Sequence, residues 1–497
     1  MINRICLIVP PSIFLLDERV FMTLGILKVA AVLEQAGVEV EMLDLSGVEN
    51  YEEVVQDYVL TSSTTCFGLT ATTPQMPAAT KVYRAIRALN PSARIILGGP
   101  HVTLVHAAYK YEQKRRMEGR GTIAFRQLED MFDVLVVGDG ELAIFEALRE
   151  GPPKLVDGDD PKSELFLTNQ KLTDLPFPAR HLMDVDSYHY TIDGVRALSM
   201  IAQLGCPFGC GFCGGRMSPF LRRVRMRTSE NIVQEMVQIY ETYGITGFML
   251  YDDELNVSPK IVELMNLIAS TQQRLGVEFR LRGFIKAELF TDEQAEAMYR
   301  AGFRWILVGF ESGHERILTN IQKKASREDN TRCMDIARRH HLKVKALMSL
   351  GHPGESEETI RSTRDWLISV KPDDFDATVI TTYPGTPYFD EAVETKPGVW
   401  TYTYPKTGDA LHSLSVDYRE VAEYYKGIPG EYTAYVYTDH LSASELVRLR
   451  DWLEADVRGT LEIPYNTGAP AVRYEHSMGQ GNIPASILRM SSMVKRG

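Results

Sequence analysis

The stretch "QLGCPFGCGFCGG", residues 203–215, places Cys206, Cys210 and Cys213 within a few positions of one another. Thiolates bind soft metal ions and clusters, and glycines let the backbone pass close to an inorganic core. A structural zinc site needs four ligands. The other three cysteines stand alone in or beside apolar segments: Cys6, Cys66 and Cys333. Three thiolates without a fourth therefore favour an iron–sulfur cluster with one open iron, with zinc or a Cys210–Cys213 redox pair as the alternatives.

The composition is that of a globular chain with several domains: 497 residues, 44% hydrophobic and 24% charged. A formal net charge of -12 argues against a broad nucleic-acid or anionic-membrane surface, which needs clustered Lys and Arg. The first residues lack the apolar region of a signal peptide, and no stretch reaches the roughly 20 apolar residues of a membrane span. We expect a cytoplasmic protein whose partners are a small molecule or another protein, with no nucleic acid and no membrane.

Six apolar stretches around and after the cysteine loop alternate with helical patterns. They are "ALSMIAQLG", "GFMLYDDE", "VEFRLRGFI", "RWILVGFESG", "KVKALMSLGHPG" and "DFDATVITTYPG". Such alternation is typical of parallel strands joined by helices, and six units predict a partial (β/α)6 TIM-type barrel over residues 193–394. The chemistry of such a barrel lies at the carboxyl ends of its strands, where the cysteine loop also falls.

The first third of the chain shows the same alternation and predicts a Rossmann-like, doubly wound parallel sheet over residues 1–150. Residues 109–130 are polar and predict a surface excursion, and residues 151–192, rich in Pro, Gly and Asp, predict a linker. The chain ends in a predicted small α+β extension, residues 395–497, with a helix over 442–457 and a loosely held tail. This extension packs as an appendage or faces the substrate.

The motif "CPFGCGFC" after a strand resembles the cluster loop of the radical S-adenosylmethionine (SAM) enzymes. The resemblance implies that Cys206, Cys210 and Cys213 bind a 4Fe-4S cluster whose open iron takes SAM. It also implies reductive cleavage of SAM to a 5'-deoxyadenosyl radical, at a strongly negative potential. An electron donor such as flavodoxin or ferredoxin is the corresponding partner.

Further motifs at the strand ends resemble the SAM contacts of this family. The resemblance assigns "LYDDELN" to the SAM amino group, "RLRGF" to an arginine near SAM, and "GFESG" to polar contacts. It places "SLGHPGE" and "TYPGTPYF" at the fifth and sixth strand ends. The SAM-contact residues it implies are Phe212, Asp253, Glu254, Arg282, Glu311 and Ser312. For each charged residue, a solvated loop charge or a structural salt bridge is the alternative.

The first domain resembles the cobalamin-binding domain that precedes the radical domain in one branch of the family. The matching stretches include "GLTATTPQMPAATKVYRAIR", "IILGGPHVT" and "VVGDGE". The predicted cobalamin contacts are Thr70, Thr72, Gly98, Gly99, His101 and Gly138. The motif D-x-H-x-x-G, which supplies a histidine below cobalt in many cobalamin proteins, is absent from the sequence. Cobalamin binding without a protein ligand to cobalt is therefore the expectation, with His101 or His106 as the less favoured ligands.

Together these resemblances imply a cobalamin-dependent (class B) radical SAM methyltransferase acting on an unactivated carbon of a small molecule, such as a natural product or a cofactor. A cyclisation, dehydration or rearrangement by the same modules is the first alternative. Methylthiolation of tRNA or protein is disfavoured, because that class has three further cysteines in its first domain, and here only Cys6 and Cys66 precede residue 151. A non-catalytic cobalamin- and cluster-based sensor or assembly protein is the non-enzyme alternative.

Overall fold

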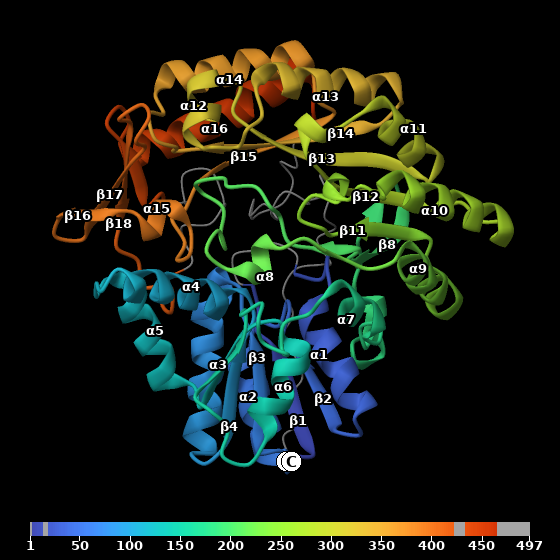
Figure 1. Cartoon of the computed structure of the whole chain (residues 1–497), viewed down its shortest axis with the longest axis vertical. Helices are drawn as coiled ribbons and strands as arrows, with labels where there is room; N and C mark the ends of the chain where they lie inside the picture. Colours follow the sequence, from blue (N-terminus) through green and yellow to red (C-terminus); the bar gives the residue numbers. More distant parts are fainter. Residues whose placement is uncertain (1, 13–17, 422–432, 465–497) are drawn as a thin grey trace.

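A six-stranded parallel sheet begins the fold in the computed structural model, which describes residues 2–12, 18–421 and 433–464 (Figure 1). Its strands follow the order β2-β1-β3-β4-β5-β6. Their bounds are β1 Arg4–Val9, β2 Glu39–Asp44, β3 Cys66–Thr70, β4 Arg94–Gly98, β5 Val134–Gly138 and β6 Leu155–Gly158. The helices are α1 Leu24–Gln35, α2 Tyr51–Thr61, α3 Met76–Leu89, α4 Pro100–Lys114, α5 Arg120–Met131 and α6 Gly140–Leu148. The predicted Rossmann-like domain is confirmed.

Helices cover both faces of this sheet, so its inner strands β1, β3, β4 and β5 are apolar on both sides. In β1, Ile5, Leu7 and Val9 pack in the core that contains α1 and α6. Cys6 and Ile8 point to the opposite core, which contains α2 and α3. Such two-sided burial explains why the strands read as continuous apolar runs rather than as an alternating pattern.

Two segments differ from the prediction. Residues 109–130, predicted as a polar excursion, belong to α4 and α5, and α5 buries Phe125 and Leu128. In the predicted linker, residues 155–158 form β6 and pair with β5. The remaining linker residues include α7 Asn169–Asp174 and the 3-10 turns Arg180–Leu182 and Val185–Ser187. The first sheet therefore continues past residue 150.

The second sheet is the predicted partial barrel, in the strand order β15-β14-β13-β12-β11-β8-β7. Its strands are β7 Thr191–Ile192, β8 Val195–Met200, β11 Gly247–Leu250, β12 Arg280–Ile285, β13 Phe303–Glu311, β14 Lys343–Leu350 and β15 Asp374–Val379. All pairs are parallel except β7 with β8. The outer helices are α9 Ser229–Tyr243, α10 Ile261–Leu275, α11 Asp292–Arg300, α12 Glu315–Asn320, α13 Arg327–Arg339 and α14 Glu357–Val370.

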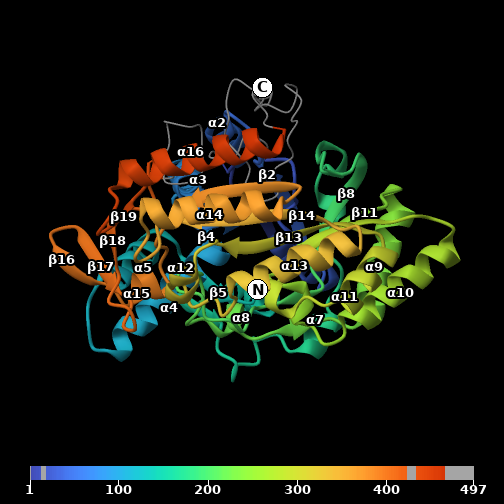
Figure 2. The same cartoon turned by 90° about the horizontal axis from the view of Figure 1, so that it is seen from above.

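Short elements complete the barrel, and a small sheet follows it. The cysteine loop is flanked by β9 Gln203–Leu204, α8 Pro219–Arg222 and β10 Arg225–Met226, and α15 is Pro387–Asp390. Short 3-10 turns occur at Thr73–Gln75, Leu255–Val257 and Ala287–Leu289. The extension contains β16 Val393–Lys396, β17 Val399–Thr403, β18 Ala410–Leu414, β19 Val436–Thr438 and α16 Ala443–Leu461. Helix α16 lies beside α14 (Figure 2), while the predicted tail lies outside the described residues.

A buried charged triad ties the linker to the barrel. The Glu235 carboxylate on α9 lies 2.7 Å from the Arg180 guanidinium and 2.5 Å from that of Arg227. Burial raises the pKa of Glu235, but the two guanidiniums outweigh this effect and hold that pKa below its usual value. The triad is therefore ionised at neutral pH and holds the linker against the start of α9.

We predict that Glu235→Ala lowers the free energy of unfolding by about 3–5 kcal/mol, because two buried guanidiniums lose their common partner. Urea denaturation of the variant measures this loss. The control is Glu241→Ala on the exposed side of α9, for which we expect less than about 1 kcal/mol. Since folding lowers the pKa of Glu235, its contribution is present at neutral pH and declines as pH falls below about 4.3, the unfolded value. Equal losses in the two variants would contradict the prediction.

Candidate functional site

The cysteine loop is an excursion closed at its base by a two-residue antiparallel ladder. Strand β9 pairs with β10 through Gln203 with Met226 and Leu204 with Arg225. Inside this base, the Cys206 N–H donates to the Leu221 carbonyl at 2.9 Å. The loop therefore begins and ends at one point, beyond the carboxyl end of β8.

Two glycines in the loop are required by close backbone packing. Gly205 has a φ of +85°, and a Cβ there would lie 2.1 Å from the Arg223 carbonyl oxygen. A Cβ at Gly211 would lie 2.5 Å from the Tyr388 ring, and the Gly211 N–H donates to the Ile321 carbonyl at 2.8 Å. The glycines thus let the loop lie directly on α15 and on the end of α12.

The three predicted cluster ligands differ in exposure. Cys206 and Cys210 are half-buried and Cys213 is exposed. Burial raises the pKa of Cys206 to about 11 and also raises that of Cys210, so metal binding has to displace their protons. Among residues 2–12, 18–421 and 433–464, no three His, Cys, Asp or Glu side chains gather around a single metal-ion position. A four-iron cluster is wider than one ion, and three thiolates on a closed glycine-rich loop suit its chemistry.

The acidic stretch after β11 holds the strand that leads into the loop. The Asp252 carboxylate accepts hydrogen bonds from the backbone N–H groups of Ala202, at 2.9 Å, and Gln203. The Asp253 carboxylate accepts one from the Gly205 N–H at 2.9 Å. Asp253, predicted as a SAM contact, thus supports the loop backbone. Burial raises the pKa of the neighbouring Glu254 to about 7, against the effect of Lys323.

Glu311 ends β13 in a left-handed conformation, with a φ of 64°. Its carboxylate lies 3.0 Å from Lys323 Nζ and accepts a hydrogen bond from the Ser349 hydroxyl at 2.7 Å. That hydroxyl is also 2.7 Å from His352 Nε2. Burial raises the pKa of Glu311, but Lys323, the Ser349 hydrogen bond and His352 together outweigh this effect and hold that pKa below its usual value. The predicted SAM contact Glu311 is therefore an oriented, ionised carboxylate.

Several residues of this network were not predicted as site residues. Lys323 and Lys286 are buried, and both oppose the effect of burial on the Cys210 pKa. Lys286 Nζ lies 4.1 Å from the centre of the Phe208 ring, inside the cysteine loop. Lysine is rarely buried unless it is paired with a charge. The lysine that directly follows the apolar strand in "GFIK" could therefore have indicated that Lys286 is a site residue.

The other predicted SAM contacts occupy different places. The Phe212 ring meets that of His352 edge-on at 5.2 Å, beside the network. Ser312 is buried, and its hydroxyl lies 3.1 Å from that of Thr363 on α14. Arg282 was predicted at the end of its strand, but it is the third residue of β12, bonded to the Tyr190 hydroxyl at 3.2 Å. The barrel curvature turns Arg282 toward β7, and Lys286 follows the strand end instead.

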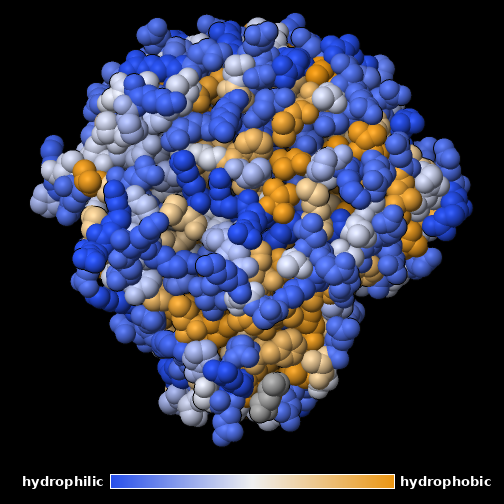
Figure 3. Space-filling view, viewed as in Figure 1, coloured by the Kyte–Doolittle hydropathy of each residue, from blue (hydrophilic) through white to orange (hydrophobic). Residues whose placement is uncertain are grey.

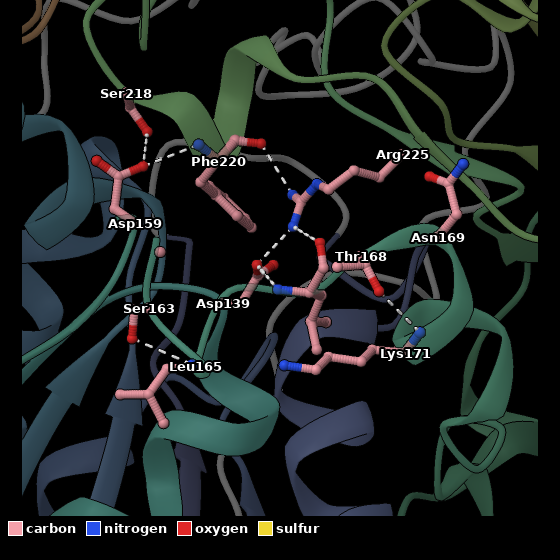
Figure 4. A network of polar contacts seen from close by, with 12 residues as sticks. Asp139, Asp159, Ser163, Leu165, Thr168, Asn169, Lys171, Ser218, Phe220 and Arg225 are labelled. Atoms are coloured by element: carbon pink, nitrogen blue, oxygen red, sulfur yellow. Dashed lines mark hydrogen bonds and ion pairs between the residues drawn. The ribbon is translucent and has the colours of Figure 1, made fainter. Parts of the chain in front are cut away.

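Two carboxylates of the first domain hold the segment that follows the cysteine loop (Figure 4). Asp159 accepts hydrogen bonds from the Ser218 hydroxyl at 2.7 Å and the Phe220 N–H at 2.8 Å. Asp139 lies 2.5 Å from the Arg225 guanidinium and accepts from the Leu167 N–H at 2.8 Å. We name Asp139, Asp159, Ser218, Phe220 and Arg225 the interdomain clamp.

A cavity of about 670 Å3 lies between the first sheet and the barrel, within the size range of cofactor pockets. Five of the predicted cobalamin contacts line it: Thr70, Thr72, Gly98, Gly99 and Gly138. The barrel contributes Ser199, Ile201 and Tyr251, and the linker adds Leu172, Leu175 and Phe177. The Ser199 hydroxyl is buried and finds no hydrogen-bond partner among the described residues. A largely apolar cavity with hydroxyls at its edge fits part of a corrin ring.

Two of the glycines at this edge are required by close packing of the protein's own backbone. Gly99 has a φ of +97°, and a Cβ there would lie 2.5 Å from the Thr70 hydroxyl oxygen. Gly138 has a φ of +74°, and its Cβ would lie 2.4 Å from the Asp159 nitrogen. Only at Gly98 would a Cβ meet ordinary contacts, the nearest at 3.8 Å. Strand packing therefore already accounts for Gly99 and Gly138.

The two histidines considered as cobalt ligands are buried in α4. His101 Nδ1 lies 3.0 Å from the Thr73 hydroxyl, and burial lowers its pKa to about 3. Burial likewise lowers the pKa of His106 to about 4. Neither residue lines the cavity, unlike the five other predicted cobalamin contacts.

We predict that Asp159→Ala loosens the segment after the cysteine loop, because it removes both hydrogen bonds to residues 218 and 220. The free energy of unfolding should fall by about 2–4 kcal/mol. Limited proteolysis should then cut residues 214–224 faster than in the wild type. The control is Asp160→Ala, one residue further and exposed. If both variants resist cleavage like the wild type, the clamp does not hold this segment.

Comparison with known proteins places these features in families. Residues 200–367 match the Radical SAM superfamily model, and residues 18–129 match that of the B12 binding domain. An uncharacterized methyltransferase of Pyrococcus horikoshii is 26% identical over 329 residues, 66% of this chain and 69% of the relative. An anaerobic magnesium-protoporphyrin IX monomethyl ester cyclase of Cereibacter sphaeroides is 25% identical over 344 residues, 65% of this chain and 52% of that protein.

Among solved structures, the radical SAM methyltransferase TsrM from Kitasatospora setae, with tryptophan substrate and a SAM analog bound, has a similar fold. Its TM-score is 0.64 at 18% identity, over 92% of this chain and 89% of TsrM. The described part of the chain contains no helix long and apolar enough to cross a bilayer. A radical SAM domain implies a 4Fe-4S cluster and SAM, and a B12 binding domain implies cobalamin. The chain thus contains a B12-binding domain followed by a radical SAM domain, as the first sheet and the cysteine loop predicted.

Proposed function

We propose that this chain is a cobalamin-dependent radical SAM methyltransferase that methylates an unactivated carbon of a small molecule. The observation that carries the proposal is the cavity between the two domains. The predicted cobalamin edge lines one side of it, and residues at the carboxyl ends of β8 and β11, Ser199, Ile201 and Tyr251, line the other. A small molecule held there would contact both domains. The proposed reaction requires this, because the small molecule has to react with SAM chemistry on the barrel side and accept a methyl group on the cobalamin side.

The proposal gives each group of residues a task. Cys206, Cys210 and Cys213 would hold the cluster, while Phe212, Glu254 and Glu311 would contact SAM. When bound, the cluster supplies the electron that cleaves SAM, and cobalamin carries the methyl group. The Lys323–Glu311–Ser349–His352 network would fix the Glu311 carboxylate for the SAM amino group. Ser312, Asp253 and Arg282 would support the site through their hydrogen bonds to Thr363, the Gly205 N–H and the Tyr190 hydroxyl.

The apolar cavity wall would keep water from the reacting centre. Residues such as Val20, Met22, Ile26 and Ile144 line the cavity from the first domain. Water near a reactive carbon centre would divert it, so an apolar wall protects the transfer. We propose a small molecule as the substrate, because a corrin ring would already fill part of the cavity of about 670 Å3.

Cyclisation is the second candidate function, because one similar protein is a cyclase. A dehydration or rearrangement belongs to the same candidate class, and a non-catalytic sensor is the remaining alternative. We also propose a protein reductant of the flavodoxin or ferredoxin type as partner. A cytoplasmic location fits this proposal, since a reducing compartment keeps the cluster thiols free of disulfides.

We predict that anaerobically reconstituted protein with a chemical reductant releases deoxyadenosine from SAM. With SAM labelled in its methyl group, the label should appear in the product once a substrate is supplied. Mass spectrometry of candidate small-molecule pools detects such a transfer. Deoxyadenosine release with an unlabelled, altered product would instead support the cyclase or rearrangement function. Absence of SAM cleavage in cluster-loaded protein would contradict both.

We predict that Ala at Cys206, Cys210 or Cys213 abolishes both cluster absorbance and SAM cleavage, because a cluster held by three thiolates cannot lose one. Iron quantification and the visible spectrum measure the loss. The matched control is Cys333→Ala, which removes a buried thiol far along the sequence. That variant should keep its iron content, with a destabilisation of about 1–2 kcal/mol. Full iron content in all three loop variants would contradict the cluster assignment.

A further inference from the structure

The segment around the cysteine loop is strongly basic in an otherwise acidic chain. Residues 204–229 contain five arginines and no acidic residue, whereas the whole chain has a net charge of -12. Two of these arginines have a carboxylate partner inside the protein: Arg225 pairs with Asp139, and Arg227 pairs with Glu235. The clamp and the triad therefore explain these two, and the other three need a separate explanation.

Arg216, Arg222 and Arg223 surround the cysteine loop, and we call them the arginine trio. Arg222 donates a hydrogen bond to the Pro207 carbonyl at 2.8 Å, directly after the first cluster cysteine. The guanidinium of Arg216 lies 3.6 Å from where a Cβ would stand at Gly209. The Arg223 guanidinium lies 5.9 Å from the centre of the Phe166 ring. No carboxylate of the described residues pairs with any of the three, unlike Arg225 and Arg227.

The trio lies beside exposed positions of the loop. Arg223, Pro207 and Cys213 are exposed, and Met217 is 43% exposed. Strongly hydrophilic side chains gather at the middle of the face in Figure 3, over the position of α8 in Figure 1. A surface that combines a guanidinium with small apolar side chains therefore reaches solvent next to the residues that would hold the cluster.

Three guanidiniums beside one loop, none paired with a carboxylate of the described residues, concentrate positive charge in a chain that has many carboxylates to neutralise it. A surface charge of this kind steers a partner of opposite charge toward one orientation. A nucleic acid fits poorly, because three cations give a small footprint and the net charge of -12 repels phosphates elsewhere. An acidic protein with a small interface fits better, since transient redox complexes bury less than about 1,200 Å2.

We propose that the arginine trio is the docking surface for an acidic one-electron carrier protein of the flavodoxin or ferredoxin type. The proposal rests on the proposed function, because it needs a cluster that is reduced in each cycle. In the step, the reduced carrier gives one electron to the oxidised cluster and leaves oxidised by one electron. No atom is exchanged. Arg222 bonds to the loop backbone and the Arg216 guanidinium lies beside Gly209 of the loop, so a carrier on the trio lies close to the cluster position.

The test is the titration of cluster-loaded, full-length protein with an oxidised flavodoxin and, separately, an oxidised ferredoxin, both anaerobic. Arg223→Glu should weaken binding about tenfold at low salt, since an attraction becomes a repulsion. The double variant Arg222→Gln/Arg223→Glu should weaken it further. Raising the salt to about 0.3 M should reduce wild-type affinity more than that of the variants, because exposed charges are screened.

The matched control is Arg274→Glu, which makes the same charge change at an exposed position in the last turn of α10. It should bind the carriers like the wild type. Iron content and SAM cleavage driven by dithionite should be unchanged in Arg223→Glu, while cleavage driven by the reduced carrier should fall. This pattern separates docking from damage to the cluster loop.

Three results would overturn the docking proposal. The first is unchanged affinity for both carriers in the single and double variants, and the second is an equal loss in Arg274→Glu. The third is loss of binding to a single-stranded RNA probe in the trio variants while carrier binding persists. Failure of dithionite to drive SAM cleavage in the wild type would instead contradict the proposed function. The binding titration still decides the docking surface in that case.

Discussion

The contact between two first-domain carboxylates and the segment after the cysteine loop is the constraint on which the site depends. Asp139 and Asp159 lie at the carboxyl ends of β5 and β6, where a parallel sheet presents its polar loops. Asp159 accepts hydrogen bonds from Ser218 and Phe220, and Asp139 pairs with Arg225, all beyond the third cysteine. The loop is thereby fixed by the domain that does not contain it, and the cavity is enclosed between the two.

This arrangement has an energetic reason. A buried carboxylate without donors costs several kcal/mol. Asp159 has Lys110 of α4 at 3.0 Å and Asp139 has the Leu167 N–H, and the second domain supplies their other donors, Ser218, Phe220 and Arg225. The segment from 218 to 225 has few contacts of its own, because it contains only one helical turn, α8. Separation of the domains would therefore remove the Ser218 and Phe220 hydrogen bonds from Asp159 and the Arg225 ion pair from Asp139. The two domains hold one geometry for this reason.

The sequence allowed prediction of the parts whose patterns are local. The six barrel strands and β1, β3, β4 and β5 are largely apolar runs between helices, β2 alternates acidic and apolar residues, and the loop is recognised by its cysteine spacing. Strand β6 was missed because "KLVDGDD" is polar, and only pairing with β5 makes it a strand. Helix α5 was missed because its buried apolar side chains, Phe125 and Leu128, are separated by charged and polar residues in the sequence.

In the site, too, residues within motifs could be predicted, whereas their partners from distant segments could not. The position of Glu311 follows from its strand, but its partners Lys323, Ser349 and His352 come from separate segments that the barrel closure brings together. Arg282 was misplaced because an apolar run does not show at which residue a strand ends. Motifs thus predict which residues meet small cofactors, while the residues that orient those side chains depend on the fold.

Two glycines of the first domain are needed for backbone packing and also line the cavity. At Gly99 and Gly138 the backbone is left-handed and another chain segment lies within 2.5 Å of a Cβ position, so packing alone excludes other residues. Gly138 is held against Asp159, which in turn holds Ser218 near the cysteine loop. A side chain at Gly138 would therefore move the clamp before it reached the cavity. The close crossing of two strand ends in the first domain thus sets the position of a loop in the second.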